Sequence, residues 1–380
     1  MRNSRKKAKS SFSFFSKSIL VFNAVAAFGL ILCYLASLIS PQTFWPLAFF
    51  GLAYPFIFLI NLCFIVYWLF RKPVYALLSV AVILLGWKFV SGTIGFRGST
   101  AIQVPKSAQN FIRVMTWNAH FFKEFDSEND KGVKDRMLDV IRNEQPDILC
   151  IQEFYSRKKG EFNIRRSITE ILNTEHYYLE YTMSNDYEGI GLAIFSKYKI
   201  RNKGHIVFPN TDLGNQVMYA DFKVNKDVFR VYNVHLQSIR FQPEDYDYLN
   251  EVKHANTDAK SSRRIGSRLK QAFIKRAEQA KLLREHALKC GLPYLIAGDF
   301  NDTPTSYAVN TLSKDMKNCF RAKGSGFGVT YNGDFPNFQI DYILVSDQFD
   351  VKNYNIIAKK LSDHYPVRAD LELKAASEEE

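Results

Sequence analysis

Residues 296–301 read Ile-Ala-Gly-Asp-Phe-Asn, a short apolar run that ends in an aspartate and an asparagine. Five more segments are built in the same way: Val-Met-Thr-Trp-Asn (114–118), Ile-Leu-Cys-Ile-Gln-Glu (148–153), Val-Tyr-Asn-Val-His-Leu (231–236), Gln-Ile-Asp-Tyr-Ile-Leu (339–344) and Leu-Ser-Asp-His-Tyr-Pro-Val (361–367). Short apolar runs are typical of buried strands, and the loops at strand ends carry functional side chains. The pattern therefore predicts strands that deliver polar groups to the rim of a sheet.

The polar residues of these motifs share one chemistry, because all of them offer oxygen or imidazole donors. They comprise four carboxylates, two amides and two imidazoles: Asn118, Glu153, His235, Asp299, Asn301, Asp341, Asp363 and His364. Oxygen donors bind hard divalent cations, and imidazoles exchange protons near neutral pH. The set is sufficient for metal-assisted acid–base chemistry on a phosphate ester.

The positive charge of the chain is concentrated in its first quarter. Of the 50 Lys and Arg residues, ten lie within residues 1–98, which contain no Asp or Glu, and the other 40 are nearly balanced by 38 acidic residues. The net charge of +12 is therefore weak evidence for nucleic-acid binding by the rest of the chain. The five cysteines have neither metal-ligand spacing nor a disulfide pattern, and we expect ordinary thiols.

The N-terminal segment predicts a multi-pass membrane region over residues 1–98. Three stretches, about 18–39, 45–70 and 74–95, are predominantly apolar and near the length of roughly 20 residues that a helix needs to cross a bilayer. The third contains Lys88, whose long side chain can reach the interface from near a helix end. Residues 99–110 are expected to form a linker.

Basic residues predict the orientation of these spans. The tail 2–17 and the turn 71–72 are cationic, whereas the loop 40–44 is uncharged, so the positive-inside rule places the tail and the turn in the cytoplasm. Three crossings then put the rest of the chain outside the cytoplasm. If the third stretch only lies in the interface, the following domain is cytoplasmic instead.

From residue 111 onward, short β-rich runs alternate with amphipathic helical patterns. Strands are predicted over 111–117, 147–152, 190–195, 217–224, 228–235, 293–298, 340–345 and 366–373, and helices over 132–144, 166–173 and 263–289. Several strands are apolar at consecutive positions, which indicates a sheet covered on both faces, whereas others alternate as antiparallel strands do. This mixture favours an α/β fold of stacked layers.

In this order, the six motifs resemble those of the endonuclease/exonuclease/phosphatase superfamily, the DNase I-like metal-dependent phosphoesterases. The resemblance covers residues 111–373, and Gly-Asp-Phe-Asn and Ser-Asp-His-Tyr-Pro are its most specific parts. It implies a four-layer α/β/β/α sandwich over residues 111–375, with the active site between the two sheet edges. The expected chain is thus a DNase I-like sandwich preceded by about three transmembrane helices.

The same resemblance implies a metal site and a water-activating group. Glu153 would be the main ligand of Mg²⁺, with Mn²⁺ as an alternative, and Asn118 and Asp363 would lie beside the metal. Asp299 would position or activate the attacking water, or handle the leaving group. Asn301 would donate to a phosphoryl oxygen of the substrate.

The resemblance also implies roles for the two histidines. Asp341 would orient and charge the imidazole of His364, and a cationic His364 would stabilise charge in the transition state. His235, which resembles the histidine of the DNase I, sphingomyelinase and phosphatase branches, would contact the scissile phosphate or protonate the leaving oxygen. The implied catalytic set is therefore His235, Asp299, Asn301, Asp341 and His364, of which His235 and Asn301 contact the substrate.

The sequence leaves the substrate open. Residues 253–289 carry eleven Lys and Arg against three acidic residues, which indicates either a guide for a polyanion or anionic membrane surface, or a solvated helix that covers the sheet. The segment 239–262 is predicted to line the substrate cleft.

A membrane-tethered phosphodiesterase or phosphatase for a lipid headgroup or small phosphoester is one hypothesis, and a membrane-anchored nuclease is the other. An inactive binding module is disfavoured because every motif position is filled, and no protein partner is indicated.

Overall fold

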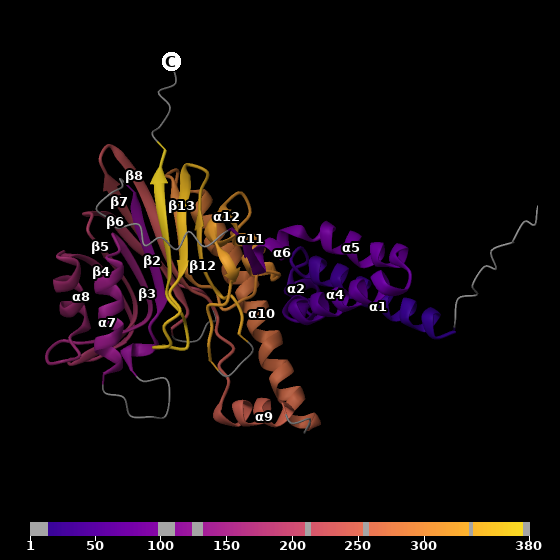
Figure 1. Ribbon diagram of the computed structural model, residues 1–380. Coiled ribbons are helices and arrows are strands. Elements are labelled where there is room, and N and C mark those ends of the chain that lie inside the picture. Colours follow the sequence, from indigo (N-terminus) through magenta and orange to yellow (C-terminus); the bar gives the residue numbers. More distant parts are fainter. Residues whose placement is uncertain are drawn as a thin grey trace, which may run out of the picture.

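The computed structural model describes residues 14–97, 111–123, 132–209, 214–253, 258–333 and 337–374. Two six-stranded sheets pack face to face, helices cover both outer faces, and a helical bundle projects from one side (Figure 1). This is the four-layer α/β/β/α sandwich that the motifs predicted, so the predicted fold class is confirmed.

The first sheet has the strand order β13-β14-β2-β3-β5-β4. Its strands are β2 (Ile112–Asn118), β3 (Ile148–Arg157), β4 (His176–Ser184), β5 (Glu188–Ser196), β13 (Phe349–Ile356) and β14 (Val367–Leu373). The central strands β2 and β3 are parallel, because α7 (Val133–Glu144) crosses over between them. Helix α8 (Ile164–Leu172) lies with α7 on the outer face of this sheet (Figure 1).

The second sheet has the order β10-β12-β9-β8-β7-β6. Its strands are β6 (Ile200–Ile206), β7 (Gln216–Val224), β8 (Asp227–His235), β9 (Tyr294–Asp299), β10 (Lys317–Asn318) and β12 (Asp341–Val345). The parallel pair β8 and β9 is joined through α9 (Pro243–Lys253) and α10 (Ala259–Leu288). Helix α11 (Tyr307–Leu312) packs beside α10, and α12 (Cys319–Lys323) follows β10.

Consecutive apolar residues in the central strands serve different layers of the sandwich. In β2, Val114 packs between the two sheets, whereas Met115 packs under α7 and α8. In β9, Leu295 packs between the sheets and Ile296 packs under α10 and α11. Side chains alternate across a strand, so a strand that is covered on both faces must be apolar throughout.

The predicted elements have counterparts in the structure, but one strand is longer than predicted and several edge strands were missed. The strand predicted to end at residue 152 continues to Arg157, because a bulge in β3 allows its pairing with β5 to resume. The strands β4, β6 and β13 were not predicted. All three lie at sheet edges, where one side needs no strand partner and polar residues are tolerated.

The N-terminal region is a bundle of helices. They are α1 (Phe14–Ala36), α2 (Pro41–Phe44), α3 (Pro46–Leu52), α4 (Tyr54–Arg71), the 3-10 helix η1 (Pro73–Tyr75), α5 (Ala76–Leu85) and α6 (Trp87–Thr93). By length and composition, α1 and α4 can each cross a membrane, and the segment from η1 to α6 adds a third span only if its two halves, bent by 72°, are taken together. The predicted stretches 45–70 and 74–95 are thus both interrupted, and the predicted linker 99–110 lies outside the described residues.

Two features hold the bundle together. The side chains of Asn23, Asn61, Trp68 and Ser79 are fully buried and hydrogen-bonded to one another across α1, α4 and α5, with distances of 2.6–3.0 Å. At the bend between α5 and α6, a Cβ atom on Gly86 would lie 2.0 Å from the ring of Tyr34. Glycine therefore permits the close approach of this bend to α1.

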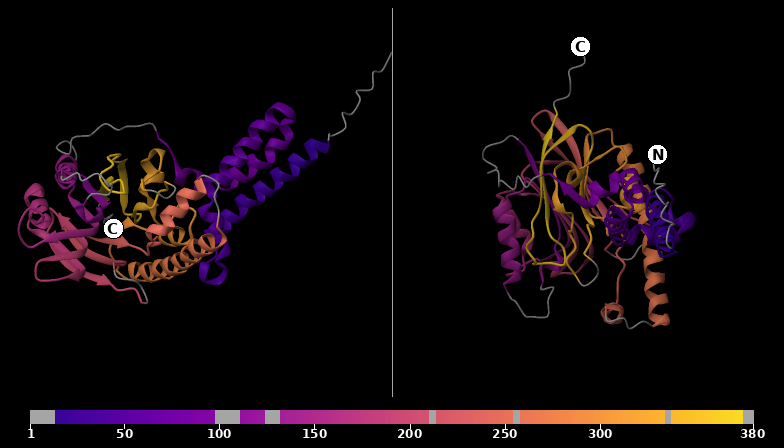
Figure 2. Two further views of the ribbon diagram at one scale, coloured as in Figure 1. Left: turned by 90° about the horizontal axis from the view of Figure 1, so that it is seen from below. Right: turned by 45° about the vertical axis from the view of Figure 1, so that its right-hand side comes forward.

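One end of the bundle is joined to the sandwich. The Thr305 hydroxyl donates to the carbonyl of Gly51 (2.7 Å), and the Asn310 amide donates to the carbonyl of Ser37 (2.9 Å). The short strands β1 (Ile94–Phe96) and β11 (Ser325–Phe327) pair antiparallel across the same junction. The other end, which holds the start of α1 and the end of α4, points away from the sandwich (Figures 1 and 2).

Gly298 provides a test of the β8–β9 pairing. Its φ is +149°, and a Cβ atom there would lie 2.0 Å from the Val234 carbonyl oxygen. We expect Gly298→Ala to destabilise the protein by about 1–3 kcal/mol through strain and overpacking. Gly266→Ala, in α10 with no neighbouring atom within 4 Å of the added Cβ, is the control and should stabilise by about 0.5–1 kcal/mol. Unfolding followed by circular dichroism measures both, and equal stabilities would contradict this account.

Candidate active site

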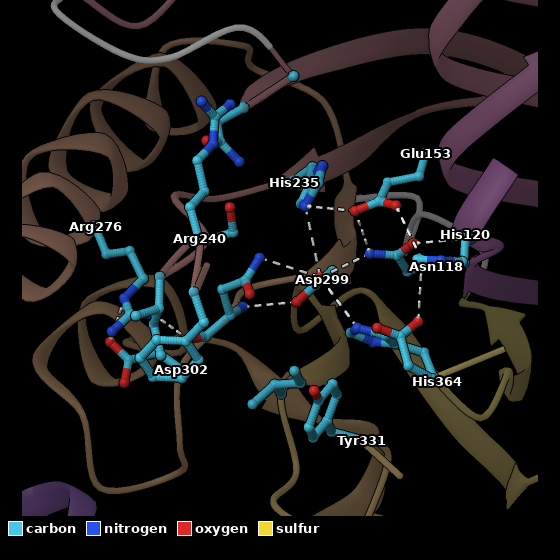
Figure 3. Close-up of a pocket in the computed structure, with 18 of the residues that line it drawn as sticks. Asn118, His120, Glu153, His235, Arg240, Arg276, Asp299, Asp302, Tyr331 and His364 are labelled. Carbon is cyan, nitrogen blue, oxygen red and sulfur yellow. Dashed lines mark hydrogen bonds and ion pairs between the residues drawn. The ribbon is translucent and has the colours of Figure 1, made fainter. Parts of the chain in front are cut away.

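The six motifs meet at one edge of the sandwich, between the two sheets. Asn118 and Glu153 come from the first sheet, and His235 and Asp299 come from the second (Figure 3). All of the predicted site residues except Asp341 line one pocket of about 490 Å³. Asp341 lies behind His364 and is hydrogen-bonded to it.

Glu153 reaches the pocket through a bulge in the middle of β3. The register of β3 against β5 shifts between Ile151 and Phe154, and Glu153 has a φ of +50°. A bulge re-aims side chains and commonly lies beside an active site. A strained backbone of this kind costs on the order of 1–3 kcal/mol, so the surrounding contacts must hold it in place.

Buried amides supply those contacts directly behind Glu153. Gln152 Nε2 donates to Asn233 Oδ1 (2.6 Å), which joins the first sheet to the second. Asn233 Nδ2 in turn donates to the carbonyls of Ile151 (3.0 Å) and Ala193 (2.9 Å). Gln152 and Asn233 are both fully buried, so the network fixes how the two halves of the site face each other.

Two carboxylates approach each other on the first-sheet side of the pocket. His120 Nδ1 lies 3.7 Å from Glu153 Oε2 and 3.7 Å from Asp363 Oδ1. Burial, and then the charge of Asp363, raise the pKa of Glu153. The interactions with His120 and His364, and then the hydrogen bond from Asn118 (3.4 Å), offset this only in part. His120 was not predicted as a site residue, although it stands two positions after Asn118.

Asp299 lies at the centre of the site and is fully buried. Its carboxylate accepts hydrogen bonds from the side chain of Asn118 (3.1 Å) and from the backbone N–H (2.7 Å) and side chain (3.1 Å) of Asn301. The Asn301 amide also donates to the carbonyl of Leu236 (3.1 Å), so Asn301 holds Asp299 in position. Burial raises the pKa of Asp299, and the charge of His364 opposes this.

His364 forms a buried ion pair with Asp341 across the two sheets. Its Nδ1 lies 2.9 Å from Asp341 Oδ2, and its Nε2 lies 3.8 Å from Asp299 Oδ2. Burial opposes protonation of His364, but the charges of Asp341, Asp299 and Asp363 raise its pKa well above the ordinary value. These charges favour the imidazolium form of His364.

The surroundings of His235 favour the opposite protonation state. Its Nε2 lies 3.7 Å from Asp299 Oδ2 and 4.0 Å from Glu153 Oε1, and the side chain is buried. Burial lowers the pKa of His235, and the charge of Asp299 does not fully compensate. The site thus combines one neutral and one cationic imidazole on either side of Asp299.

Two groups of side chains offer metal-ligand atoms, and their chemistry differs. Within the described part of the chain, Asp299, Asp341 and His364 bring ligand atoms within 4.8 Å of one another. Because His364 is protonated and held by Asp341, this group is better suited to holding a proton. The oxygen atoms of Asn118, Glu153 and Asp363 suit a hard divalent cation, which would relieve the repulsion that raises the pKa of Glu153.

An ion pair between α10 and the loop after β9 supports this arrangement. Arg276 Nε lies 3.1 Å from Asp302 Oδ2, both side chains are buried, and the Arg276 guanidinium also donates to the carbonyl of Asn301 (Figure 3). Asp302 follows the Gly-Asp-Phe-Asn motif directly, which is the one sequence signal that could have identified it. Arg276 is one of eleven basic residues in its segment, and nothing distinguished it from the others.

Comparisons with known proteins agree with this geometry. A family model described as "Endonuclease/Exonuclease/phosphatase family" matches residues 115–364, and a second, described as a domain of unknown function (DUF8431), matches residues 16–93. The comparison with curated proteins gives no match.

Solved structures from several bacteria share the fold. An endonuclease/exonuclease/phosphatase from Bacteroides vulgatus is 20% identical, with a TM-score of 0.51, and the match covers 70% of this chain and 100% of that chain. A protein of the same description from Beutenbergia cavernae DSM 12333 is 20% identical, with a TM-score of 0.50 and coverage of 70% and 73%. A mannosyl-6-phosphatase from Bacteroides thetaiotaomicron VPI-5482 is 18% identical, with a TM-score of 0.50 and coverage of 69% and 100%.

At these identities the solved structures establish the fold, and the family model establishes the relationship. That model spans more than half of the 380 residues and includes all eight of the predicted site residues. The chain therefore belongs to the endonuclease/exonuclease/phosphatase family and is a phosphoester-hydrolysing enzyme.

Proposed function

We propose that this protein is a membrane-anchored, Mg²⁺-dependent phosphoesterase that hydrolyses its substrate by attack of water on phosphorus. The observation that carries the proposal is the convergence of two groups on one pocket: the oxygen donors Asn118, Glu153 and Asp363, and the proton-holding group of Asp299, His235 and His364. Mn²⁺ is the alternative cation. The fold shared with a mannosyl-6-phosphatase makes phosphomonoesters, as well as diesters, candidate substrates.

Glu153, Asp363 and Asn118 would hold the metal. A divalent cation there would neutralise the phosphate and stabilise charge on the leaving oxygen. The chain itself contributes the remaining steps. Asp299, with its raised pKa and two amide partners, would orient water and accept its proton.

The two histidines would act on the phosphate in different ways. The imidazolium of His364, held by Asp341, would stabilise the negative charge that develops on the phosphoryl oxygens. His235 lies on the opposite side of Asp299 and would contact the scissile phosphate or protonate the leaving oxygen. Asn301 would position Asp299 and donate to a phosphoryl oxygen when the substrate displaces its present partners.

The bundle is proposed to anchor the enzyme in a membrane as a multi-pass region. The start of α1 and the end of α4 at Arg71 lie at the end of the bundle away from the sandwich, as the cationic tail 2–17 and turn 71–72 would require for the cytoplasmic side (Figure 1). The sandwich then lies on the opposite, extracytoplasmic side. This topology requires α5 and α6 together to complete the third crossing.

The alternative of a tethered nuclease depended on the basic segment 253–289. Several of its cations have partners within the protein: Arg264 and Arg268 pair with Asp245, and Arg284 pairs with Asp315. Arg276 is buried against Asp302, as described above. These contacts favour α10 as a structural helix, so a nuclease has no specific observation in its support.

Replacing Glu153 tests the metal site. We expect Glu153→Ala to lower turnover of p-nitrophenyl phosphate and bis(p-nitrophenyl) phosphate at least about 100-fold and to abolish the increase in melting temperature that Mg²⁺ causes in the wild type. EDTA should abolish wild-type turnover in the same assays. Glu170→Ala, on the exposed side of α8, is the control and should retain both properties. Turnover that persists in Glu153→Ala or in EDTA would rule out this metal site.

The ion pair between His364 and Asp341 predicts a pH effect. The protonated imidazole is the active form, and its pKa is raised, so wild-type activity should persist at neutral pH and fall only as alkaline pH deprotonates His364. Asp341→Asn removes the charge that raises this pKa, so the alkaline loss of activity should move to lower pH. His364→Ala should lower turnover at least about 100-fold at neutral pH and should lack this alkaline loss of activity. An unchanged alkaline limb in Asp341→Asn, measured as kcat against pH, would contradict the proposed role.

A further inference from the structure

The pocket at the active site has two chemically different ends. One end carries the carboxylates, amides and histidines described above. The other end is lined by apolar side chains from the loop after β8, from α10 and from the N-terminal bundle: Leu52, Ile239, Phe241, Leu269 and Phe273. Its volume of about 490 Å³ lies within the range of about 300–1,000 Å³ for small-molecule sites, so it can hold a phosphorylated headgroup and part of an apolar chain.

The apolar end is a packed wall, to which the bundle contributes. Leu269 and Phe273 lie one turn apart on α10 and therefore share a face. The ring of Phe49, in α3, packs edge-on against Phe273 with ring centroids 5.4 Å apart. Leu52 belongs to the same apolar cluster and lines the pocket. Helix α3 thus contributes Leu52 to the lining of the pocket and supports Phe273 through Phe49.

The position of Leu52 connects this wall to the apolar helices of the anchor. Leu52 is the last residue of α3, and α4, which is long and apolar enough to cross a membrane, begins two residues later. Near the start of α3, Lys270 of α10 lies 4.8 Å from the centre of the half-exposed Trp45 ring. Aromatic and cationic side chains of this kind are typical of the membrane–water interface.

We propose that the pocket binds an amphiphilic phosphoester from the bilayer, with its phosphate at the catalytic residues and its apolar chain along Leu52, Phe241, Leu269 and Phe273. The inference rests on the proposed function and adds the substrate class to it. A nucleotide or a sugar would place polar groups against these four apolar side chains, none of which can form a hydrogen bond. An alkyl chain would release water from the wall instead.

The reaction is a balanced hydrolysis that needs no further reactant. The oxygen of water forms a bond to phosphorus, and the bond between phosphorus and the ester oxygen of the amphiphile breaks. One proton of water passes to the leaving oxygen, and the phosphate product keeps the other oxygen–hydrogen bond. Cleavage of the ester on the chain side releases the chain as an alcohol and leaves the phosphate on the headgroup or free. Cleavage of a diester on the headgroup side releases the headgroup as an alcohol and leaves the phosphate on the chain.

The test is the dependence of turnover on alkyl chain length. The full-length enzyme in dodecyl maltoside, a detergent without a phosphoester, is assayed with Mg²⁺ on two series from methyl to octyl: alkyl phosphates, read by phosphate release, and alkyl p-nitrophenyl phosphates, read by nitrophenol release. We expect kcat/KM to rise by up to about fourfold for each methylene that the wall buries, as about 0.8 kcal/mol per methylene implies. Plasmid DNA is assayed in parallel.

Variants locate the effect at the wall. Leu52→Asn should reduce the rise in kcat/KM to less than about twofold per methylene. Leu52→Trp fills the apolar end of the pocket, so kcat/KM should stop rising at a shorter alkyl chain. Leu288→Asn is the matched control: Leu288 is exposed, stands on the same helix as Leu269 and lies outside the pocket. Its dependence on chain length should equal that of the wild type.

The outcomes separate the two proposals. Metal-dependent turnover with no dependence on alkyl chain length, with or without DNA nicking, would contradict an amphiphilic substrate. The proposed phosphoesterase function would still stand. If both Leu52 variants depend on alkyl chain length as the wild type does, the alkyl chain does not bind along this wall. The absence of metal-dependent turnover on every substrate, DNA included, would overturn the proposed function and this inference together.

Discussion

Two buried amides, Gln152 and Asn233, tie the sheets together directly behind the active site. Leaving either amide without partners would cost about 1–3 kcal/mol, so the sheets cannot slide past each other without losing these bonds. Gln152 precedes Glu153 in the bulge of β3, and Asn233 stands two residues before His235 on β8. This one junction therefore sets how far apart the Glu153 and His235 side chains lie, and the geometry of the whole site depends on it.

A rigid junction of this kind allows charges to be buried close together. Glu153 and Asp299 both have raised pKa values because they are desolvated and because each lies near another carboxylate, Asp363 for Glu153 and Asp341 for Asp299. The imidazolium of His364 balances part of this charge on one side of the pocket, where Asp341 holds it. On the other side, Glu153 and Asp363 meet beside the His120 imidazole, whose Nδ1 lies 3.7 Å from an oxygen of each. The proposed metal would neutralise the negative charge of Glu153 and Asp363 that the protein itself does not balance.

Local pattern predicted the central elements and missed the peripheral ones. The strands β2 and β9 are covered on both faces. Their residues must be apolar at consecutive positions whichever elements cover them, so the sequence alone indicates a buried strand. The edge strands β4, β6 and β13 are extended because a neighbouring strand pairs with them, and the sequence does not identify that neighbour. The bend at Gly86 likewise depends on the ring of Tyr34, which lies on another helix.

The sequence by itself determined the family, because its motifs are local signals, and it predicted the reacting groups proposed here, of which Glu153 and Asp299 each end an apolar run. Only the tertiary structure decided which histidine is charged, because protonation depends on burial and on carboxylates that are distant in the chain. Only the tertiary structure placed Leu52 in the wall of the pocket. In the sequence, an apolar residue between two apolar helices has the same pattern whether it faces lipid, core or substrate.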